Sequence, residues 1–580
     1  MAERDSTPGE ASGHARAASR RDFLRRAGIG AAGLAIGGSA GAAVTAAATA
    51  HPPEFAPLAR RSAPGFDHVV VLMFENRSFD NMLGWLYSAD EKSKDEFDGL
   101  AQGSYSNKDA DGTDIPAHVY DGSTDEVMQS PQPDPGETYS HVNTQLFDVL
   151  DPSSNADIAK NGLLPPYNAP PPGTEPGNDG FVKDFAVNYR LTTGKKAKAA
   201  DVRVAMGGFS PAQMPVLSTL AREFAVYDSW FAAVPSQTYC NRSFFHASTS
   251  NGYVTNHGGD GYAKWIDGPE SATIFNRLEE AGVSWRVYYD ASQLVSLTGM
   301  LHAPAIRKYW QSNFRDMDQF AADAANGDLP AYSFIEPRMV FNHNDMHPPF
   351  GTMRESDVDE DGQKIDVANS ALSDVRAGDA LLQQVYDAIR TSATPTGSNA
   401  MNTVLLVTFD EHGGTYDHVA PPAAVPPDRS GPGEMGFAFD RLGLRLPTIA
   451  ISAYTAAGTV IHDEMHHGSV INTLCRLHGL RPLTARDQSA NPIFNAVNLT
   501  DPRQPYTWPQ PTALYTPTNP EESPENAAKK SGHRKLTSPA RGLLGMLLAR
   551  YNPGAKAPET YADAYAAITR FGTGLFGTKD

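Results

Sequence analysis

Short runs of apolar residues recur along the chain, and polar turn residues follow each of them at once. Residues 67–74 (DHVVVLMF) and 402–409 (NTVLLVTF) are rich in β-branched side chains and apolar on both faces. A run of this kind predicts a strand buried inside a sheet. Residues 332–335 and 446–452 repeat the pattern and predict two further strands.

Stretches with helical spacing of apolar residues separate these runs. Residues 211–223 and 372–390 are predicted helices. Strands that alternate with helices indicate one large α/β domain, which the length of 580 residues also favours. Residues 164–178, with six prolines and two glycines, predict a loop.

The two ends of the chain differ from this central pattern. Residues 51–65 are rich in proline and alanine and are interpreted as a linker, and a domain over residues 66–515 follows. Residues 516–580 predict a polar linker and a short helical extension, with apolar helices near 542–548 and 561–568. We expect the extension to dock on the domain. The alternative is transient contact with a membrane surface, because a short amphipathic helix can lie on a bilayer.

The first fifty residues (1–50) predict a targeting signal. The sequence SRRDFL at 19–24 precedes a weakly apolar run rich in glycine and alanine, as in twin-arginine export signals. Small residues at the end of this run predict cleavage near Ala50. We therefore expect the twin-arginine machinery to export the protein, which would be secreted, cell-surface or periplasmic. Glycine motifs at 28–33 and 37–41 lie inside this signal, so they support neither a dinucleotide-binding enzyme nor a serine hydrolase.

Composition and charge exclude some functions. The chain carries 48 basic and 67 acidic side chains, a formal net charge of −19. An acidic surface repels the phosphates that dominate nucleic-acid affinity, so we expect no DNA or RNA partner. Two cysteines, Cys240 and Cys475, are too few for a disulfide framework or a four-cysteine zinc site. One disulfide and two free thiols both stay open.

Acidic side chains follow the two strongest predicted strands. Glu75 and Asn76 come after the first run, and Asp410 and Glu411 come after the second. Because ligands in open α/β sheets bind outside the carboxyl ends of the strands, we expect these side chains to lie together. Carboxylate and amide oxygens suit a hard cation. The sequence therefore predicts one divalent or trivalent metal ion, with calcium, manganese, magnesium and iron all open.

A hydroxyl nucleophile and several histidines complete the candidate chemistry. Thr238, with Ser236 as its nearest rival, lies among turn residues after an apolar stretch. Coordination to a metal would lower the pKa of such a hydroxyl. Histidines beside a metal can bind phosphoryl oxygens or protonate a leaving alkoxide. The candidate histidines are His141, His343, His347, His418, His466 and His467.

Four ordered motifs together resemble a known family. They are residues 75–80 (ENRSFD), 238–242 (TYCNR), 410–419 (DEHGGTYDHV) and 467–469 (HGS). They closely resemble the phosphoesterase family, which contains bacterial phospholipases C, plant non-specific phospholipases C and certain acid phosphatases. The resemblance extends over about residues 66–500, with the motifs in the family's order.

The resemblance implies a fold and a set of residue roles. The fold would be an alkaline-phosphatase-like α/β core with a central, mostly parallel sheet flanked by helices. Thr238 would be the nucleophile and would form a phosphothreonine intermediate. The metal ligands would be Glu75, Asn76, Thr238, Asp410 and Glu411. His347, His418 and His467 would assist catalysis, and the substrate would contact Asn76, His141, Asp345, His347 and His467. Asp417 would support His418 from behind.

The resemblance favours an exported, metal-dependent phospholipase C that releases diacylglycerol and a phosphorylated head group from glycerophospholipids. A phosphomonoesterase of the acid phosphatase type is the alternative, because the same groups can serve monoesters. A non-catalytic surface binding protein is disfavoured, since a suitable residue stands at every expected metal position. Cys240, Met346 and Gly468 depart from the family's usual residues, which bears on substrate choice more than on catalysis.

Two acidic loops begin like calcium-binding loops. The first starts with residues 357–362, but the twelfth position counted from Asp357 is Ala368, where a calcium-binding loop needs glutamate. Residues 107–114 have a similar start and a similar defect. A solvated acidic loop is the preferred interpretation of both.

Overall fold

The computed structural model describes most of the chain after its first segment. The described residues are 57–91, 97–149, 169–170, 173–257, 262–290, 293, 295–340, 343–349, 356–358, 364–366, 374–514, 536, 538–556 and 558–575. Contacts divide the chain into two units, Met1–Phe55 and Ala56–Asp580. The predicted export signal and its cleavage site near Ala50 lie outside the described residues, as does most of the predicted linker at 516–538.

An eight-stranded sheet lies at the centre of the described part of the second unit, in the order β15-β6-β14-β13-β1-β10-β8-β9. Five neighbouring pairs are parallel, and the pairs β13/β14 and β14/β6 are antiparallel. The predicted α/β core with a mostly parallel sheet is therefore confirmed. The strands are β1 (His68–Phe74), β6 (Ala225–Tyr227), β8 (Trp285–Tyr289), β9 (Phe314–Asp316), β10 (Tyr332–Ile335), β13 (Thr403–Phe409), β14 (Thr448–Ile451) and β15 (Thr459–Ile461).

The two strongest predicted strands are neighbours in the middle of this sheet. β1 and β13 pair in parallel from His68 opposite Thr403 to Phe74 opposite Phe409. Every residue of β13 is buried, and so is every residue of β1 after His68, as expected for strands covered on both faces. Because the strands end level with each other, the acidic residues that follow them leave the sheet at one point.

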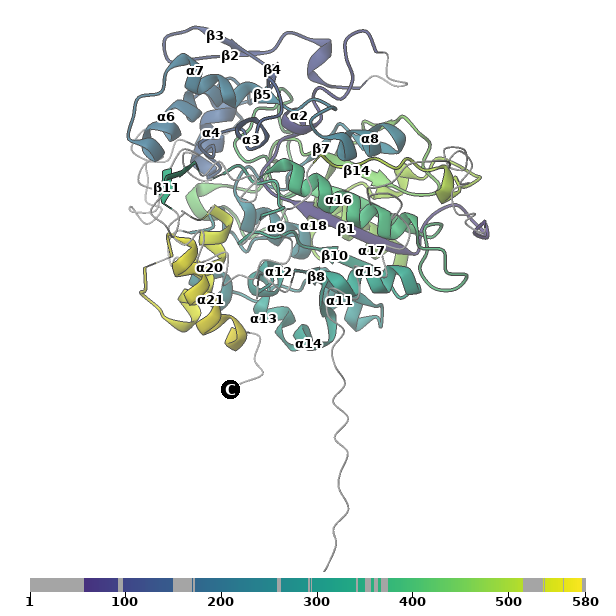
Figure 1. Cartoon of the computed structure of the whole chain (residues 1–580). Coiled ribbons are helices and arrows are strands. Elements are labelled where there is room, and N and C mark those ends of the chain that lie inside the picture. Colours follow the sequence, from purple (N-terminus) through teal and green to yellow (C-terminus); the bar gives the residue numbers. More distant parts are fainter. Residues whose placement is uncertain are drawn as a thin grey trace, which may run out of the picture. The chain divides into compact units, whose positions relative to one another are not determined.

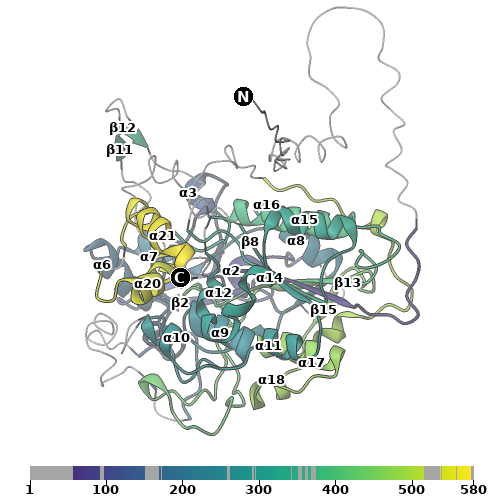
Figure 2. The same ribbon diagram turned by 90° about the horizontal axis from the view of Figure 1, so that it is seen from below.

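Helices cover both faces of the sheet. Figure 2 shows α15 (Met317–Asn326) and α16 (Val375–Arg390) on one side, and α9 (Thr238–Ala247), α11 (Ile274–Glu280) and α17 (Gly468–His478) on the other. The predicted helix at 211–223 is α8 (Pro215–Glu223), which packs beside α16. Asp379 of α16 accepts the first N–H groups of α8, from Val216 and Leu217, at 3.0 and 2.9 Å.

Shorter elements surround the sheet (Figure 1). The remaining helices are α2 (Phe79–Met82), α3 (Asp125–Met128), α4 (Tyr139–Phe147), α6 (Phe181–Thr193), α7 (Ala199–Val202), α10 (Ala263–Asp267), α12 (Leu297–Leu301), α13 (Ala303–Ile306), α14 (Trp310–Asn313), α18 (Ala485–Ser489), α20 (Ser538–Tyr551) and α21 (Tyr561–Leu575). The remaining strands are β2 (Ser106–Lys108), β3 (Asp114–Pro116), β4 (His118–Val119), β5 (Gly207–Gly208), β7 (Trp230–Phe231), β11 (Ser356–Val358), β12 (Lys364–Asp366) and β16 (Met465–His466).

The two acidic loops belong to hairpins. β2 pairs antiparallel with β3, and the Asp109 carboxylate between them accepts the N–H groups of Asp111 and Thr113, both at 2.9 Å. These bonds are those of a solvated turn, as the sequence suggested. β11 and β12 also pair antiparallel, while the residues between them lie outside the described part of the chain.

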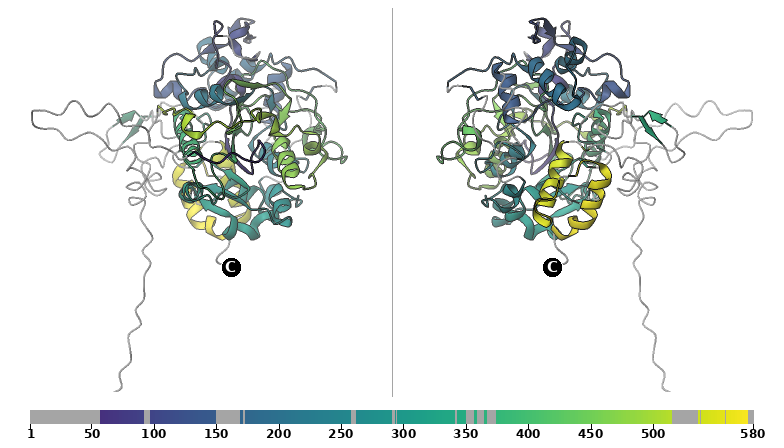
Figure 3. Two further views of the ribbon diagram at one scale, coloured as in Figure 1. Left: turned by 90° about the vertical axis from the view of Figure 1, so that its right-hand side faces the viewer. Right: turned by 90° about the vertical axis from the view of Figure 1, so that its left-hand side faces the viewer.

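The C-terminal extension packs on the core through α20 and α21, the yellow helices of Figures 1 and 3. Leu544 and Leu547 of α20 are fully buried in one apolar cluster with Tyr239 of α9 and Trp265 of α10. A side chain at Gly542 would place its Cβ 2.4 Å from the Tyr239 hydroxyl, so only glycine permits this close approach. Within the described residues, no helix combines the length and the apolar character that crossing a membrane requires.

Both cysteines are free thiols. Cys240 lies on α9 and Cys475 on α17, and each is buried. Of the two alternatives that the sequence left open, the structure has the two free thiols.

Candidate active site

The acidic residues after β1 and β13 meet at the carboxyl edge of the sheet, as predicted. The N–H of Asn76 donates to Asp410 Oδ1 at 3.0 Å, and the N–H of Asp410 donates to the Phe74 carbonyl at 3.1 Å. Asn76 has a positive φ of 57°, which turns the chain sharply after the strand. A Cβ at Gly413 would lie 2.1 Å from the Asn76 carbonyl, so glycine is required where the two turns touch.

Thr238 is the first residue of α9 and faces this edge. Its hydroxyl donates toward Glu75 Oε2 at 3.3 Å and lies 3.4 Å from Asn76 Oδ1. The rival hydroxyl of Ser236 donates instead to the carbonyl of Val254. Thr238 is therefore the hydroxyl that lies among the predicted metal ligands.

Arg242 lies one turn further along α9, on the same face as Thr238. Its Nη2 donates to Glu75 Oε1, and its Nε lies 3.4 Å from Asp410 Oδ2. Burial disfavours the charged guanidinium, but these two carboxylates outweigh it and raise the pKa of Arg242. The sequence placed this arginine in a motif without giving it a role, and the structure shows it as the buried cation between the two strand ends.

Two further buried carboxyls complete the site. Glu411 accepts the Gly413 N–H through Oε2 at 2.6 Å, while its Oε1 is buried with no hydrogen-bond partner among the described residues. Glu137, just before α4, accepts Gln237 Nε2 at 3.2 Å through one oxygen and Asn76 Nδ2 through the other. Sequence reasoning missed Glu137, because a single glutamate after a Pro-Gly turn carries no ligand pattern.

The charges of this site are unbalanced. Four carboxyls are buried here, those of Glu75, Glu137, Asp410 and Glu411, and the guanidinium of Arg242 contacts two of them, Glu75 and Asp410. Burial raises the pKa of each carboxyl, to about 7 for Glu137 and well above the ordinary value for Glu75 and Glu411. Buried carboxylates stay ionised only when a cation or hydrogen bonds compensate them. The oxygen donors and the bare Glu411 Oε1 therefore fit a hard metal cation.

His467 and His347 lie at the same edge. His467 Nε2 is 2.6 Å from the Asp410 carbonyl, and burial lowers the pKa of His467 to about 4. His347 Nε2 is 3.8 Å from Glu137 Oε2, and burial likewise lowers its pKa to about 4. Both imidazoles are therefore neutral near pH 7. Asp345 is close as well, since its carbonyl accepts the Glu75 N–H at 2.9 Å.

His347 also belongs to a group that could itself hold a metal ion. Ligand atoms of Asp134, Glu137 and His347 all lie within 4.8 Å of one another, and all three residues are buried. A second such group consists of Asp80, Asp417 and His418. Carboxylate and imidazole ligands are thus available at two places in the described part of the chain.

Two of the predicted histidines have carboxylate partners of their own. His141 Nδ1 lies 2.7 Å from Asp184 Oδ1, between α4 and α6. His418 lies between Asp80 and Asp98, at 2.7 and 3.0 Å. The hydrogen bonds of His418 thus lead away from Thr238 and the strand-end carboxyls, so its catalytic role stays a prediction.

Asp417 reaches His418 through an arginine. Its Oδ1 accepts Arg445 Nε at 2.9 Å, and Arg445 Nη2 lies 3.0 Å from Asp80 and 3.2 Å from His418 Nδ1. Asp417 therefore supports the position of His418 indirectly, by holding Arg445.

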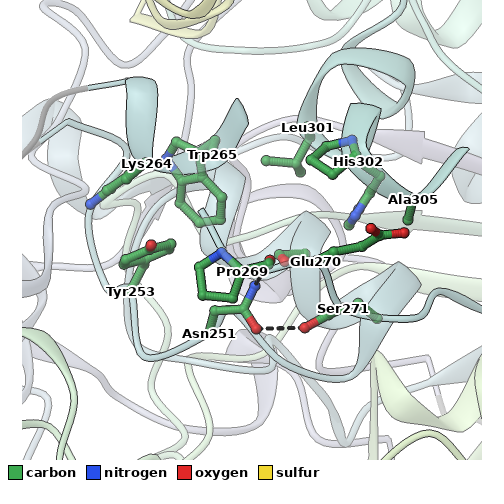
Figure 4. Close-up of a pocket in the computed structure, with 13 residues that line it drawn as sticks. Asn251, Tyr253, Lys264, Trp265, Pro269, Glu270, Ser271, Leu301, His302 and Ala305 are labelled. Carbon is green, nitrogen blue, oxygen red and sulfur yellow. Dashed lines mark hydrogen bonds between the residues drawn. The ribbon is translucent and has the colours of Figure 1, made fainter. Parts of the chain in front are cut away.

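A separate pocket lies beside α9 and α10 (Figure 4). Lys264, Trp265, His302 and Asn251 are among its lining residues, and none of the predicted site residues is. Lys264 pairs with Glu434 at 2.7 Å and lies over the Tyr253 ring, 4.9 Å from its centroid. The ammonium group of Lys264 therefore already has its partners.

Comparison with known proteins gives consistent relatives. The chain is 31% identical over 470 residues to non-specific phospholipase C3 of Arabidopsis thaliana, covering 77% of each protein. It is 32% identical over 463 residues to non-specific phospholipase C1 of the same plant, covering 75% of this chain and 72% of that protein. It is 25% identical over 346 residues to phospholipase C B of Mycobacterium tuberculosis, covering 53% and 58% of the two chains.

Among solved structures, similarity is more distant. An alkaline phosphatase superfamily protein from Vibrio parahaemolyticus is 14% identical, with a TM-score of 0.27 over 49% of this chain and 65% of that one. The lipoteichoic acid synthase LtaP from Listeria monocytogenes is 14% identical, with a TM-score of 0.29 over 50% and 70%.

The sequence model of the phosphoesterase family matches residues 66–361 and 363–481. That range contains the strand-end carboxyls, Thr238 and His467, which meet at one edge of the sheet. Together with the phospholipase C relatives, the match shows that this chain belongs to the phosphoesterase family and is a phospholipase C-like hydrolase of phosphoric esters.

Proposed function

We propose that the protein is a metal-dependent phospholipase C, which hydrolyses glycerophospholipids to diacylglycerol and a phosphorylated head group. The observation that carries the proposal is the Thr238 hydroxyl, which lies 3.3 Å from Glu75 and 3.4 Å from Asn76 in a buried site with excess carboxyl groups. Similarity to plant non-specific phospholipases C over about three quarters of the chain supports the choice of substrate class.

Glu75, Asn76, Thr238, Asp410 and Glu411 would hold the metal ion, whose identity among calcium, manganese, magnesium and iron stays open. When bound, the metal would lower the pKa of the nucleophilic hydroxyl and offset negative charge on the phosphoryl oxygens. Arg242 contacts Glu75 and Asp410, opposes the rise that burial causes in the pKa of both carboxyls, and holds them between the two strand ends.

In the first step, Thr238 Oγ1 forms a bond to phosphorus while the bond from phosphorus to the glycerol oxygen breaks. Glu75 Oε2 is the acceptor nearest to the hydroxyl proton. Glu75 would take the hydroxyl proton, the departing oxygen would take a proton from solvent and leave as diacylglycerol, and Thr238 would carry the phosphorylated head group. With a monoester substrate, the same step would leave a simple phosphothreonine.

In the second step, water attacks phosphorus, the head group leaves with its phosphate, and Thr238 regains its proton from Glu75. His467 is suited to accept the proton from water. Its Nε2 lies 2.6 Å from the Asp410 carbonyl, an acceptor only, so the ring proton of the neutral imidazole is at Nε2 and Nδ1 keeps its lone pair.

The route out of the cell is a further part of the proposal. Residues 19–24 (SRRDFL) and the small residues before Ala50 support export by the twin-arginine machinery. The lipid substrate requires transient contact with a membrane surface after export.

Product analysis tests the proposed activity. Purified protein spanning residues 51–580 and its Thr238→Ala variant are offered phosphatidylcholine and an aryl phosphate monoester under metal-replete conditions. Phosphocholine and diacylglycerol from the wild type alone are the expected result. Orthophosphate from the monoester with untouched lipid would instead identify a phosphomonoesterase, and no turnover of either would favour a surface binding protein.

A further inference from the structure

A series of hydrogen bonds leads from a backbone amide to the Asn76 side chain. The N–H of Asn256 donates to Gln237 Oε1 at 3.0 Å, so the Gln237 amide turns its Nε2 the other way. Gln237 Nε2 then donates to Glu137 Oε1 at 3.2 Å, and Asn76 Nδ2 donates to Glu137 Oε2. Because a backbone N–H can only donate, it fixes the orientation of the Gln237 amide, whose NH₂ group therefore faces Glu137.

The Glu137 carboxylate decides how the Asn76 amide is turned, because an ionised carboxylate can only accept. The Glu137 carboxylate accepts from both amide groups, so Asn76 Nδ2 faces Glu137 and Asn76 Oδ1 faces the opposite side. On that side lies the Thr238 hydroxyl, 3.4 Å from Asn76 Oδ1. With the amide turned over, an NH₂ group would point at the metal ligands, and an NH₂ group cannot bind a cation.

The rest of Asn76 is already held without Glu137. Its N–H donates to Asp410 Oδ1 at 3.0 Å, and its carbonyl is packed against Gly413. The rotation of the side-chain amide is thus the degree of freedom on which Glu137 acts. Gln237 directly precedes Thr238, so the same bonds also tie the start of α9 to Asn76.

We propose that Glu137 is a positioning residue for the active site: together with Gln237 it holds the Asn76 amide with its oxygen toward Thr238 and the metal. The proposal rests on the proposed function, because it treats Asn76 as a ligand of the catalytic metal.

Exchanging the two side chains provides the test. In Glu137→Gln, the new amide has one oxygen for two donors. If that oxygen accepts from Asn76, its NH₂ group faces the NH₂ group of Gln237. If it accepts from Gln237 instead, Asn76 loses its acceptor and its amide can turn over. The double variant Glu137→Gln/Gln237→Glu restores every bond. Its carboxylate at position 237 accepts from the Asn256 N–H and from the new amide at position 137, and the oxygen of that amide accepts from Asn76 Nδ2. Asp379→Asn is the matched control, because it changes another buried carboxyl that accepts two N–H groups, outside the site.

Three quantities are measured for each variant. They are the affinity for Mn²⁺ alone by calorimetric titration, the kcat/KM for whichever of phosphatidylcholine and the aryl phosphate the wild type cleaves better, and the midpoint of thermal unfolding. Loss of a partner that orients a metal ligand typically lowers metal affinity or activity about 10- to 100-fold, which is expected for Glu137→Gln. The double variant should recover most of both quantities. Asp379→Asn should lower the thermal midpoint and leave the Mn²⁺ affinity unchanged.

Three results would overturn the positioning role. The first is an unchanged Mn²⁺ affinity in Glu137→Gln. The second is a double variant that binds Mn²⁺ as weakly as Glu137→Gln, which would make Glu137 itself a ligand. The third is a wild type that binds no metal. A wild type that binds Mn²⁺ but cleaves neither ester would refute the proposed function alone, and the affinities of the variants would still decide the role of Glu137.

Discussion

Arg242 is the residue on which the charge balance of the site depends most. Its guanidinium contacts both Glu75 and Asp410 and is fully buried with them. Removing one partner of a buried ion pair leaves the other charge without compensation. The resulting loss of stability is larger than the net stabilisation that the intact pair provides. The side chain therefore serves folding as well as the arrangement of the proposed metal ligands.

We expect Arg242→Met to lower the free energy of unfolding by about 3–5 kcal/mol in metal-free protein. Urea unfolding monitored by circular dichroism measures the loss. Arg60→Met, at the exposed ion pair with Asp501, is the control and should change stability little. Equal stability of Arg242→Met and wild type would contradict the account of the charges.

The surroundings of the His418 imidazole predict a pH dependence of the unfolding free energy that is separate from catalysis. Burial alone would lower the pKa of His418, but the carboxylates of Asp80 and Asp98 outweigh it and raise the pKa to about 9. Its ordinary value is 6.5. Because the folded protein binds the proton more tightly, this stabilisation is complete below about pH 6.5 and is lost as the pH rises through about 9.

The expected result is a loss of unfolding free energy on the order of 2 kcal/mol between about pH 6 and about pH 9.5. Urea unfolding across this pH range measures it, with His418→Gln as the comparison. The variant should be less stable at the acidic end of the range and show a smaller slope. A variant with the wild-type slope would mean that other groups cause the pH dependence.

At the scale of elements, α20 packs directly behind the helix that presents Thr238. Leu547 of α20 is fully buried in the cluster that includes Tyr239, the residue after Thr238. Replacing a buried leucine with alanine removes its transfer free energy and leaves a cavity. The C-terminal extension is thus a structural part of the domain that holds the active site.

Leu547→Ala should lower the free energy of unfolding by about 2–4 kcal/mol, while the exposed Arg550→Ala on the same helix should have little effect. Thermal unfolding of both variants measures the difference. If Leu547→Ala unfolded like the wild type, the packing of α20 on α9 and α10 would be refuted.

The elements that the sequence predicted best are those whose own residues carry a strong apolar pattern. β1, β10, β13 and β14 are continuous apolar runs, and each formed a strand within a few residues of its predicted range. β6 (AVY) and β9 (FRD) are three residues long, too short to give a periodic signal, and they exist because a longer neighbour supplies the hydrogen bonds. β8 (WRVYY) carries Arg286 near its start, which masked the run.

The same distinction holds for the site. Glu75, Asn76, Asp410 and Glu411 were predictable because each follows a strong strand, and neighbouring parallel strands bring their ends together. Glu137 was not, because only the folded chain brings the residues before α4 next to Asn76. His418 follows Glu411 closely in the sequence, yet a turn at Gly413 and Gly414 leads the chain away, and His418 lies beside Asp80 and Asp98 instead.

At the scale of the whole molecule, the net charge of −19 bears on the lipid surface that the protein can approach. A strongly acidic protein is repelled by anionic membranes, and salt screens this repulsion. A zwitterionic surface presents no such barrier. The proposed phospholipase C is therefore suited to neutral glycerophospholipids.

We expect hydrolysis of phosphatidylcholine in vesicles to slow as an anionic lipid is added, and added salt to restore the rate. Head-group release from vesicles of graded composition measures this effect, and a soluble short-chain substrate serves as the control, since its rate should change little. Faster hydrolysis on anionic vesicles at low salt would contradict the electrostatic argument.

The central claim is that Thr238 forms the covalent bond to phosphorus. The direct measurement is peptide mass spectrometry of the protein after acid quenching during turnover of phosphatidylcholine, with Thr238→Ala treated in parallel. The account predicts a phosphocholine adduct on the peptide that contains Thr238, and neither adduct nor turnover in the variant. An adduct on another residue, or undiminished turnover by Thr238→Ala, would contradict it.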